Sequence, residues 1–316
     1  MQQHFNAFGG EERIWMGPEG GQFSVFFEKG TNFDLENWNV PTAFDSEPFD
    51  IVQSDLTSAT FRKDFSLQNY SGTIFHATID RTVTLLNSKS VDTLLGIKPD
   101  KSVSSVAYQS VNQLKNTGTN GWNRNDGALS VWMLSMLKGS PETTVVIPYI
   151  KDGKDNIVTS YFGDIPGSRL KITDNAVFFL ADGMFRSKIG IRPENSTPYI
   201  GSYDSKDHIL TIIEFTLPEN TTEYVNSILE IQEEPFHGDA INSFNNGSKE
   251  NSLQNDRYFE LELSSPAAFL KPGEKITHVQ NVYHFTGREK HLDKLAKFLL
   301  KVPIKEIKNA FRSNKD

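Results

Sequence analysis

The chain has 316 residues, with 40 acidic against 32 basic side chains and a formal net charge of −8. This acidic balance argues against nucleic acid and anionic membrane surfaces as partners. Because the chain has no cysteine, disulfides and thiolate metal sites are excluded.

No run of about 18 apolar residues occurs, so we expect no transmembrane segment. No signal peptide is visible either, since the first residues lack a basic start and an apolar core. The chain nevertheless enters a structured motif by residue 9, which suggests that the native protein carries a further portion upstream. With 37% hydrophobic residues, including 23 Phe, there is ample material for the core of one large domain, and we expect residues 1–316 to form a single domain.

The first structured stretch runs from Phe8 to Phe27. Glycine pairs at Gly9-Gly10 and Gly20-Gly21 allow positive φ or close backbone approach. Between these pairs, Arg13–Met16 is typical of a short strand, and the alternation in Phe23–Phe27 predicts a second one.

The glycine-rich loop between these two strands holds Glu19 on a corner near Arg13 and Trp15. A carboxylate, a guanidinium and an indole on one turn suit recognition of a polar ring such as a sugar. The alternative is a structural double turn with a surface ion pair, and residue chemistry alone does not separate the two.

Alternating or β-branched segments continue through the rest of the chain. They predict strands at 49–53, 57–65, 73–86, 102–115, 143–149, 176–180, 188–191, 199–203, 208–216, 258–263 and 276–285, with a further apolar run at 128–137. Arg81 lies on the mainly apolar side of its strand, so that face is not expected to be fully buried.

Helices are few in this pattern. A short turn is expected within Asp34–Trp38, and a serine N-cap and a glycine stop predict a helix over Ser90–Gly96. Residues 238–257 are rich in asparagine and are expected to form a long polar loop. An amphipathic segment at 289–299 and a second short helix after Pro303 predict a helical cap, 288–312, on a sheet edge.

The common catalytic and cofactor motifs are absent: we find no G-x-S-x-G, H-E-x-x-H, P-loop or G-x-G-x-x-G signature. We therefore expect no cofactor, and no tight ligand spacing indicates a metal. The strongest constellation is the strand from Tyr258 to Ser264, where Glu260 and Glu262 share one face. If that face is desolvated, the pKa of at least one carboxyl rises and the group can act as an acid or base. The alternative is a solvated outer face with two ordinary glutamates.

Other candidates lie in earlier segments of the sequence. His237 and Asp239 stand at the mouth of the asparagine-rich segment, and Arg186 and Lys188 point to one side of a strand. The two basic groups suit a hydroxylated or anionic ligand, or they simply pair with the acidic excess.

Four motifs together resemble a known family: GGEERIWMGPEGGQFS (9–24), LKNTGTNGW (114–122), IGSYD (200–204) and YFELELSSPAA (258–268). The chain is similar over nearly its whole length to a bacterial family of unassigned function in the galactose mutarotase-like (aldose 1-epimerase-like) superfamily. The resemblance implies an all-β fold, the β-supersandwich, with two large antiparallel sheets and a sugar cleft. It also implies an export signal and further strands upstream in the full-length form, and so a periplasmic or extracellular location.

The resemblance assigns roles as well. In aldose epimerases a glutamate in an L-E-x-x-x-x-P setting is the base, and Leu261-Glu262 followed by Pro266 fits that spacing loosely. The partner histidine of those enzymes is missing from 116–136, where Trp122 and Trp132 stand instead. His237 is the most plausible substitute acid.

The leading hypothesis is a carbohydrate-active or carbohydrate-binding protein whose partner is a mono- or oligosaccharide. Glu262 would be the base or acceptor, and Trp15 or Trp122 the stacking platform. A non-catalytic sugar-binding module and a polysaccharide hydrolase or lyase remain as alternatives. The hydrolase would pair Glu262 with Glu19 or Asp239.

Overall fold

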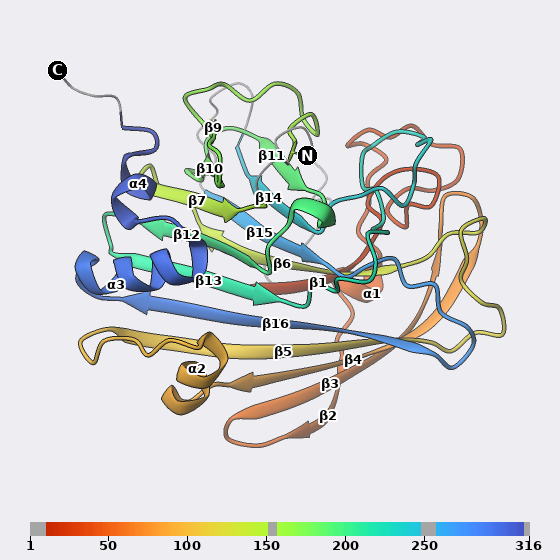
Figure 1. Cartoon of the computed structure of the whole chain (residues 1–316). Helices are drawn as coiled ribbons and strands as arrows, with labels where there is room; N and C mark the ends of the chain where they lie inside the picture. The colour runs from red at the N-terminus through yellow and green to blue at the C-terminus, as the bar shows by residue number, and fades with distance from the viewer. Residues whose placement is uncertain (1–10, 151–156, 248–256, 313–316) are drawn as a thin grey trace.

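The structure is a computed structural model that describes residues 11–150, 157–247 and 257–312. The expected all-β architecture is confirmed. Within the described ranges, two antiparallel sheets of ten and six strands are accompanied by short helices (Figure 1). The first glycine pair, Gly9-Gly10, lies outside the described residues.

The larger sheet contains most of the long strands that the sequence predicts. In spatial order its strands are β2 (Asp50–Ser54), β3 (Ser58–Gln68), β4 (Ile74–Leu85), β5 (Ser104–Asn116), β16 (Lys275–Thr286), β13 (Ile209–Phe215), β12 (Tyr199–Asp204), β7 (Thr143–Pro148), β10 (Ala176–Leu180) and β9 (Leu170–Ile172). The smaller sheet has the order β1 (Glu12–Gly17), β6 (Ser130–Lys138), β15 (Tyr258–Ser264), β14 (Ile241–Asn245), β11 (Ser187–Ile191) and β8 (Ile157–Val158).

The two sheets pack face to face because each strand turns one apolar set of side chains inward. On β15 the inward set is Phe259, Leu261 and Leu263, and it packs in one core cluster with residues of the ten-stranded sheet such as Val145 and Val282. The alternate residues of β15, which include both glutamates, therefore point to the outer face of the six-stranded sheet.

The burial of Arg81 differs from the expectation that its face of the strand would be partly exposed. Arg81 lies on the inward face of β4 and is only 9% exposed, although an arginine there suggested an open face. Glu12 of β1 approaches from the opposite sheet and places its Oε2 2.5 Å from Arg81 Nη2. A paired charge can be buried where an unpaired one cannot.

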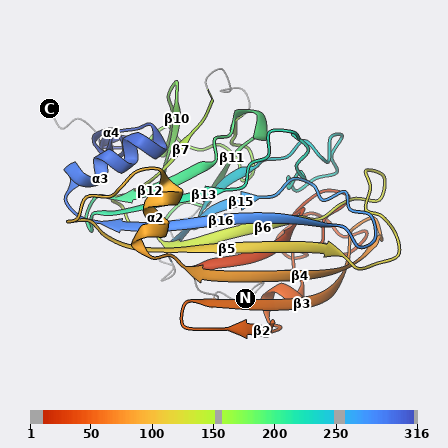
Figure 2. The ribbon, with the colours of Figure 1, turned by 60° about the horizontal axis from the view of Figure 1, so that its bottom comes forward.

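The C-terminal helices cover a face rather than an edge. The π-helical turn η3 (Ala296–Leu300) and α4 (Ile304–Asn309) lie against β7 and β12, which are interior strands of the large sheet, and α3 (Glu289–Leu295) packs against both η3 and α4 (Figures 1 and 2). Their apolar residues share a core cluster with the outward side chains of that sheet and with α2 (Ser88–Leu95). The predicted position on a sheet edge is therefore wrong, because the amphipathic stripe finds its apolar partner on the outer face.

Three local predictions also differ from the structure. Phe23–Phe27 is buried but forms turns, with Ser24 N donating to Gly21 O at 3.0 Å. The first part of the expected polar loop, 238–257, contains β14, and residues 248–256 lie outside the described residues. The N-cap of α2 is Asn87, whose side chain accepts a hydrogen bond from Ser90 N.

The turn expected within Asp34–Trp38 is present, with Asn37 N donating to Asp34 O at 3.3 Å. The remaining short helices are α1 (Thr42–Asp45), after Pro41, and the 3₁₀ turn η2 (Pro193–Asn195). No helix in the described part of the chain is long and apolar enough to cross a membrane.

Candidate functional site

The candidate site lies on the outer face of the six-stranded sheet. Strand register brings its residues together: Trp15 pairs with Trp132, and Glu262 pairs with Leu134 on one side and Asn242 on the other. Because side chains alternate along a strand, β1, β6, β15 and β14 all contribute polar or aromatic groups to this one face.

Lys188 of β11 is the centre of the site. Its Nζ lies 2.9 Å from Glu262 Oε2 and 3.5 Å from Glu19 Oε2. The side chain of Lys188 is only 4% exposed and that of Glu262 only 1%. The ammonium also lies 4.8 Å from the centroid of the Trp132 ring and 5.3 Å from that of Tyr161, within the range of cation–π attraction.

Electrostatics keeps Lys188 charged despite its burial. Desolvation lowers the pKa of the ammonium, but Glu262 and Glu19 outweigh it and hold the pKa above its ordinary value. Burial in turn raises the pKa of Glu262, against the lowering influence of Lys188 and of the hydrogen bond from Trp132 Nε1, at 3.0 Å.

Glu19 reaches this position because of the glycine corner that the sequence indicates. A Cβ on Gly20 would lie 2.2 Å from the backbone oxygen of Ile228, so only glycine lets the corner pack this closely. Gly21 has φ +80, which also favours glycine. The backbone N–H of Glu19 donates to Ser227 Oγ at 3.1 Å, which ties the corner to the loop around residue 228.

Glu260 completes the pair of carboxyls on β15. It is buried, and burial together with the charge of Glu262 raises the pKa of Glu260 to about 8, opposed by Arg13 and Lys188. The alternative of a solvated outer face with two ordinary glutamates is therefore wrong. Both glutamates are buried, and the cations Arg13 and Lys188 stabilise negative charge on this face of the sheet.

A second hydrogen-bonded group borders the first. Tyr161 OH donates to Asp239 Oδ2, and Asn242 Nδ2 donates to the same oxygen at 3.3 Å and to Tyr161 OH at 3.2 Å. Burial raises the pKa of Asp239 to about 6. A Cβ on Gly190 would lie 1.8 Å from Asp239 Oδ2, so the missing side chain on β11 makes room for this carboxylate.

Replacing Tyr161 with phenylalanine is expected to lower the free energy of unfolding by about 1.5 kcal/mol, because a buried carboxylate loses a donor. Urea denaturation at pH 7 measures this change. Tyr70→Phe is the matched control, since Tyr70 OH donates to the neutral oxygen of Thr31 at 3.0 Å and its loss should cost less. Equal losses in the two variants would contradict the prediction.

Neither of the two tryptophans predicted to stack on a sugar ring, Trp15 and Trp122, is exposed to solvent. Trp15 is 5% exposed and packs against Phe26, Trp38 and Trp132, with ring centroids 5.4 to 5.9 Å apart. Trp122 is 6% exposed and meets the ring of Phe75 edge-on. Both indoles belong to a core cluster, so the structure corrects the expectation that either offers a face to a sugar.

The other predicted residues lie at the border of the site. The contacts of His237 are with Arg192 Nη1, 2.8 Å from its Nδ1, and with Glu234 Oε2 at 3.1 Å. Arg186 stacks over the ring of Phe162 at 4.7 Å. Their roles as acid and as ligand-binding group stay predictions.

The sequence alone did not single out Tyr161 and Asn242, and it noted Trp132 only in place of a missing histidine. Tyr161 carries no local signal, whereas Trp132 and Asn242 follow once the register of β6, β15 and β14 is known. Among the described residues, no group of three His, Asp or Glu side chains is arranged to hold a metal ion.

Comparison with known proteins shows which family the sequence matches. The profile of a family of unknown function, DUF6786, matches residues 1–311, which confirms the expected family of unassigned function over nearly the whole chain. No curated protein matches the sequence.

Several solved structures have a similar fold. One is a candidate aldose 1-epimerase from Escherichia coli K12, with 12% identity over 86% of this chain and 83% of that one and a TM-score of 0.49. Another is a galactose mutarotase-like protein from Lactobacillus casei ATCC 334, with 10% identity over 86% and 84% and a TM-score of 0.47. A galactose mutarotase related enzyme from Lactobacillus acidophilus gives 10% identity over 86% and 82% and a TM-score of 0.45. At such identities the likeness concerns the fold alone.

Proposed function

The chain belongs to the family of unknown function DUF6786, and from its own site we propose that it binds a sugar ring on the outer face of the six-stranded sheet. We further propose that Glu262 accepts the anomeric hydroxyl proton, as in an aldose epimerase. The observation that carries the proposal is the meeting of Glu19 and Glu262, from opposite ends of the chain, on the one ammonium of Lys188.

The chemistry of an epimerase requires two groups with different protonation. A base removes the proton from the anomeric hydroxyl, and an acid protonates the ring oxygen as the ring opens. Glu262 is oriented for the first role by Lys188 and Trp132. Glu260, with its pKa raised to about 8, carries a proton at neutral pH and shares a face of β15 with Glu262, so we propose it as the donor in place of His237.

A sugar can reach Lys188, Glu262 and Glu260 only if the side chains that shield them from solvent move. Lys188, Glu262 and Glu260 are all buried, and Glu19 and Tyr161 are the more exposed groups above them. Separation of Glu19 from Lys188 would expose the ammonium and both carboxyls of β15. Such opening is common in enzymes that shield their reaction from water.

A non-catalytic sugar-binding module is the second candidate. One observation favours it: Glu262 already accepts from both Lys188 and Trp132, which reduces its strength as a base. A hydrolase fits less well, because Lys188 lies between Glu19 and Glu262, where a scissile bond would have to lie.

Polarimetry on freshly dissolved α-glucose and α-galactose tests the enzyme proposal. The wild type is expected to speed mutarotation above the buffer rate, and Glu262→Gln to return it to that rate, because the amide cannot accept the proton. Circular dichroism of both proteins controls for folding.

Two outcomes would decide against catalysis by Glu262. Equal rates for the wild type and Glu262→Gln remove Glu262 as the base. Saturable binding of either sugar in calorimetry, without faster mutarotation, favours the binding module instead.

A further inference from the structure

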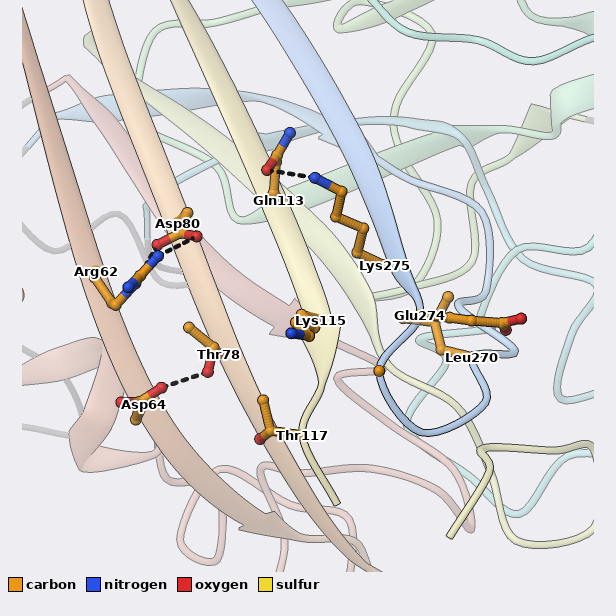
Figure 3. A pocket seen from close by; sticks show the side chains of 11 residues that line it. Arg62, Asp64, Thr78, Asp80, Gln113, Lys115, Thr117, Leu270, Glu274 and Lys275 are labelled. Carbon is orange, nitrogen blue, oxygen red and sulfur yellow. Dashed lines mark hydrogen bonds and ion pairs between the residues drawn. The ribbon is translucent and has the colours of Figure 1, made fainter. Parts of the chain in front are cut away.

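A groove of about 760 Å³ lies on the opposite side of the molecule, on the outer face of the ten-stranded sheet. Its floor is formed by β3, β4, β5 and the start of β16, and its wall by the turn that carries Leu270 and Glu274 (Figure 3). None of its lining residues belongs to the site around Lys188. The groove is therefore independent of the function proposed above.

Strand register arranges the lining side chains in two rows. The first row runs from Arg62 through Asp80 to Gln113, and the second from Asp64 through Thr78 and Lys115 to Lys275. Because directly paired residues point to the same face, each row crosses the groove as a line of polar groups.

The acidic side chains of the groove are already engaged. Arg62 Nε lies 2.6 Å from Asp80 Oδ1, and Thr78 donates to Asp64. Glu274 Oε2 accepts from the backbone N–H of Lys271 at 2.8 Å. These carboxylates have partners within the groove or on its wall.

The two lysines of the groove, Lys115 and Lys275, differ from the carboxylates in their partners. Lys275 Nζ donates to the neutral amide oxygen of Gln113 at 3.1 Å, and neither Lys115 nor Lys275 forms an ion pair among the described residues. Lys115 and Lys275 are directly opposed across β5 and β16. Like charges in that arrangement repel each other, so the pair lowers stability unless an anion lies between them.

We propose that this groove binds an acidic saccharide, whose carboxylate or sulfate lies between Lys115 and Lys275. Neighbouring polar groups suit the hydroxyls of the sugar: Thr117 can donate and accept, Gln113 Nε2 can donate, and Thr78 and Asp64 can accept through their remaining lone pairs. The length of the groove across several strands suits an oligosaccharide better than a single small anion. The lining of the groove carries three basic side chains (Arg62, Lys115 and Lys275) and three acidic ones (Asp64, Asp80 and Glu274). Because the carboxylates have partners and the two lysines form no ion pair among the described residues, the lysines are the groups of the groove that suit an added anion.

Calorimetric titration of the full chain tests the proposal, with trigalacturonate as the carboxylate probe and a κ-carrageenan tetrasaccharide as the sulfate probe. At least one is expected to bind, and comparison of the two identifies the acidic group. Affinity should fall about tenfold in Lys115→Gln and in Lys275→Gln, since each loses a charge-assisted contact. It should also fall as salt is raised from 20 to 150 mM, roughly the range over which exposed charges become screened.

Lys171→Gln is the matched control, because Lys171 is also exposed on the large sheet, on β9, but far from the groove. It should bind like the wild type. Urea midpoints of the two groove variants should not fall, since each substitution removes a repulsion.

Three results would overturn the proposal. The first is that maltotriose, which is neutral, binds as tightly as the acidic probes. The second is that both groove variants keep wild-type affinity. The third is that hexaglutamate binds as tightly as either saccharide, which would assign the groove to acidic peptides.

Discussion

Replacing Lys188 with methionine is expected to lower the free energy of unfolding by about 3–5 kcal/mol, the usual effect of removing one partner from a buried ion pair. The side chain lies at the centre of the site, 2.9 Å from Glu262 and 3.5 Å from Glu19, and is only 4% exposed. Methionine keeps most of the volume and the contact with Trp132 but removes the charge. The buried carboxyls would then lack their nearest cation.

Urea denaturation at pH 7 measures this loss, with Lys171→Met as the control for a surface lysine. The control is expected to stay within about 0.5 kcal/mol of the wild type. The double variant Lys188→Met/Glu262→Gln should recover part of the loss, because no charge is left facing the missing ammonium. If the double variant loses as much as the two single variants added together, the ion pair does not stabilise the site.

Long-strand segments were predictable from the sequence, because each carries its own alternation. The strand 73–86 matches β4 (Ile74–Leu85) within a residue at each end, and 276–285 matches β16 (Lys275–Thr286). In β4, one face packs in a core and the other is polar, so the period of two is visible without any partner strand. In β16 both faces become buried toward the end of the strand, with Val282 on one side and Tyr283 and Phe285 on the other, and its aromatic and β-branched residues still indicate a strand.

β14 was missed for the opposite reason. Asn242 and Asn245 are polar but buried, and their amides find partners within the fold: Asn245 Nδ2 donates to Phe185 O at 2.9 Å. A strand with asparagine on both faces looks like a loop until these partners are known. Phe23–Phe27 shows the reverse error, since its aromatic residues are buried by packing against other rings rather than by strand pairing. Phe26 packs against Trp15 and Trp38, and Phe23 against Phe236.

The candidate site was predictable in part. Glycine chemistry indicated the corner that holds Glu19, and strand alternation placed Glu260 and Glu262 on one face. The sequence could not indicate that Lys188 would join the two, because that contact depends on the register of β11, β14 and β15. It also could not separate exposed indoles from buried ones, which is why Trp15 and Trp122 were expected to bind the sugar.

The protein is expected to become less stable as pH rises from 6.5 to 8.5, by about 2 kcal/mol, because of Glu260. Its pKa in the folded chain is raised to about 8 from an ordinary value of 4.5 by burial and by Glu262, with Glu19 adding and Arg13 and Lys188 opposing. The native state therefore keeps a proton that the unfolded chain has already released. The stability from this group is present at low pH and is lost as pH rises toward 8.

This pH window separates Glu260 from two other buried groups, Asp239 and His278. Asp239, with a pKa near 6, has largely completed its change below it, and His278, whose pKa burial lowers to about 4, is neutral in the native state throughout. Urea midpoints of the wild type and Glu260→Gln across the window make the test, since the amide cannot titrate and its curve should be flatter. Parallel curves would mean that Arg13 and Lys188 keep Glu260 ionised at neutral pH. The proton donor proposed for sugar-ring opening would then have to be another group.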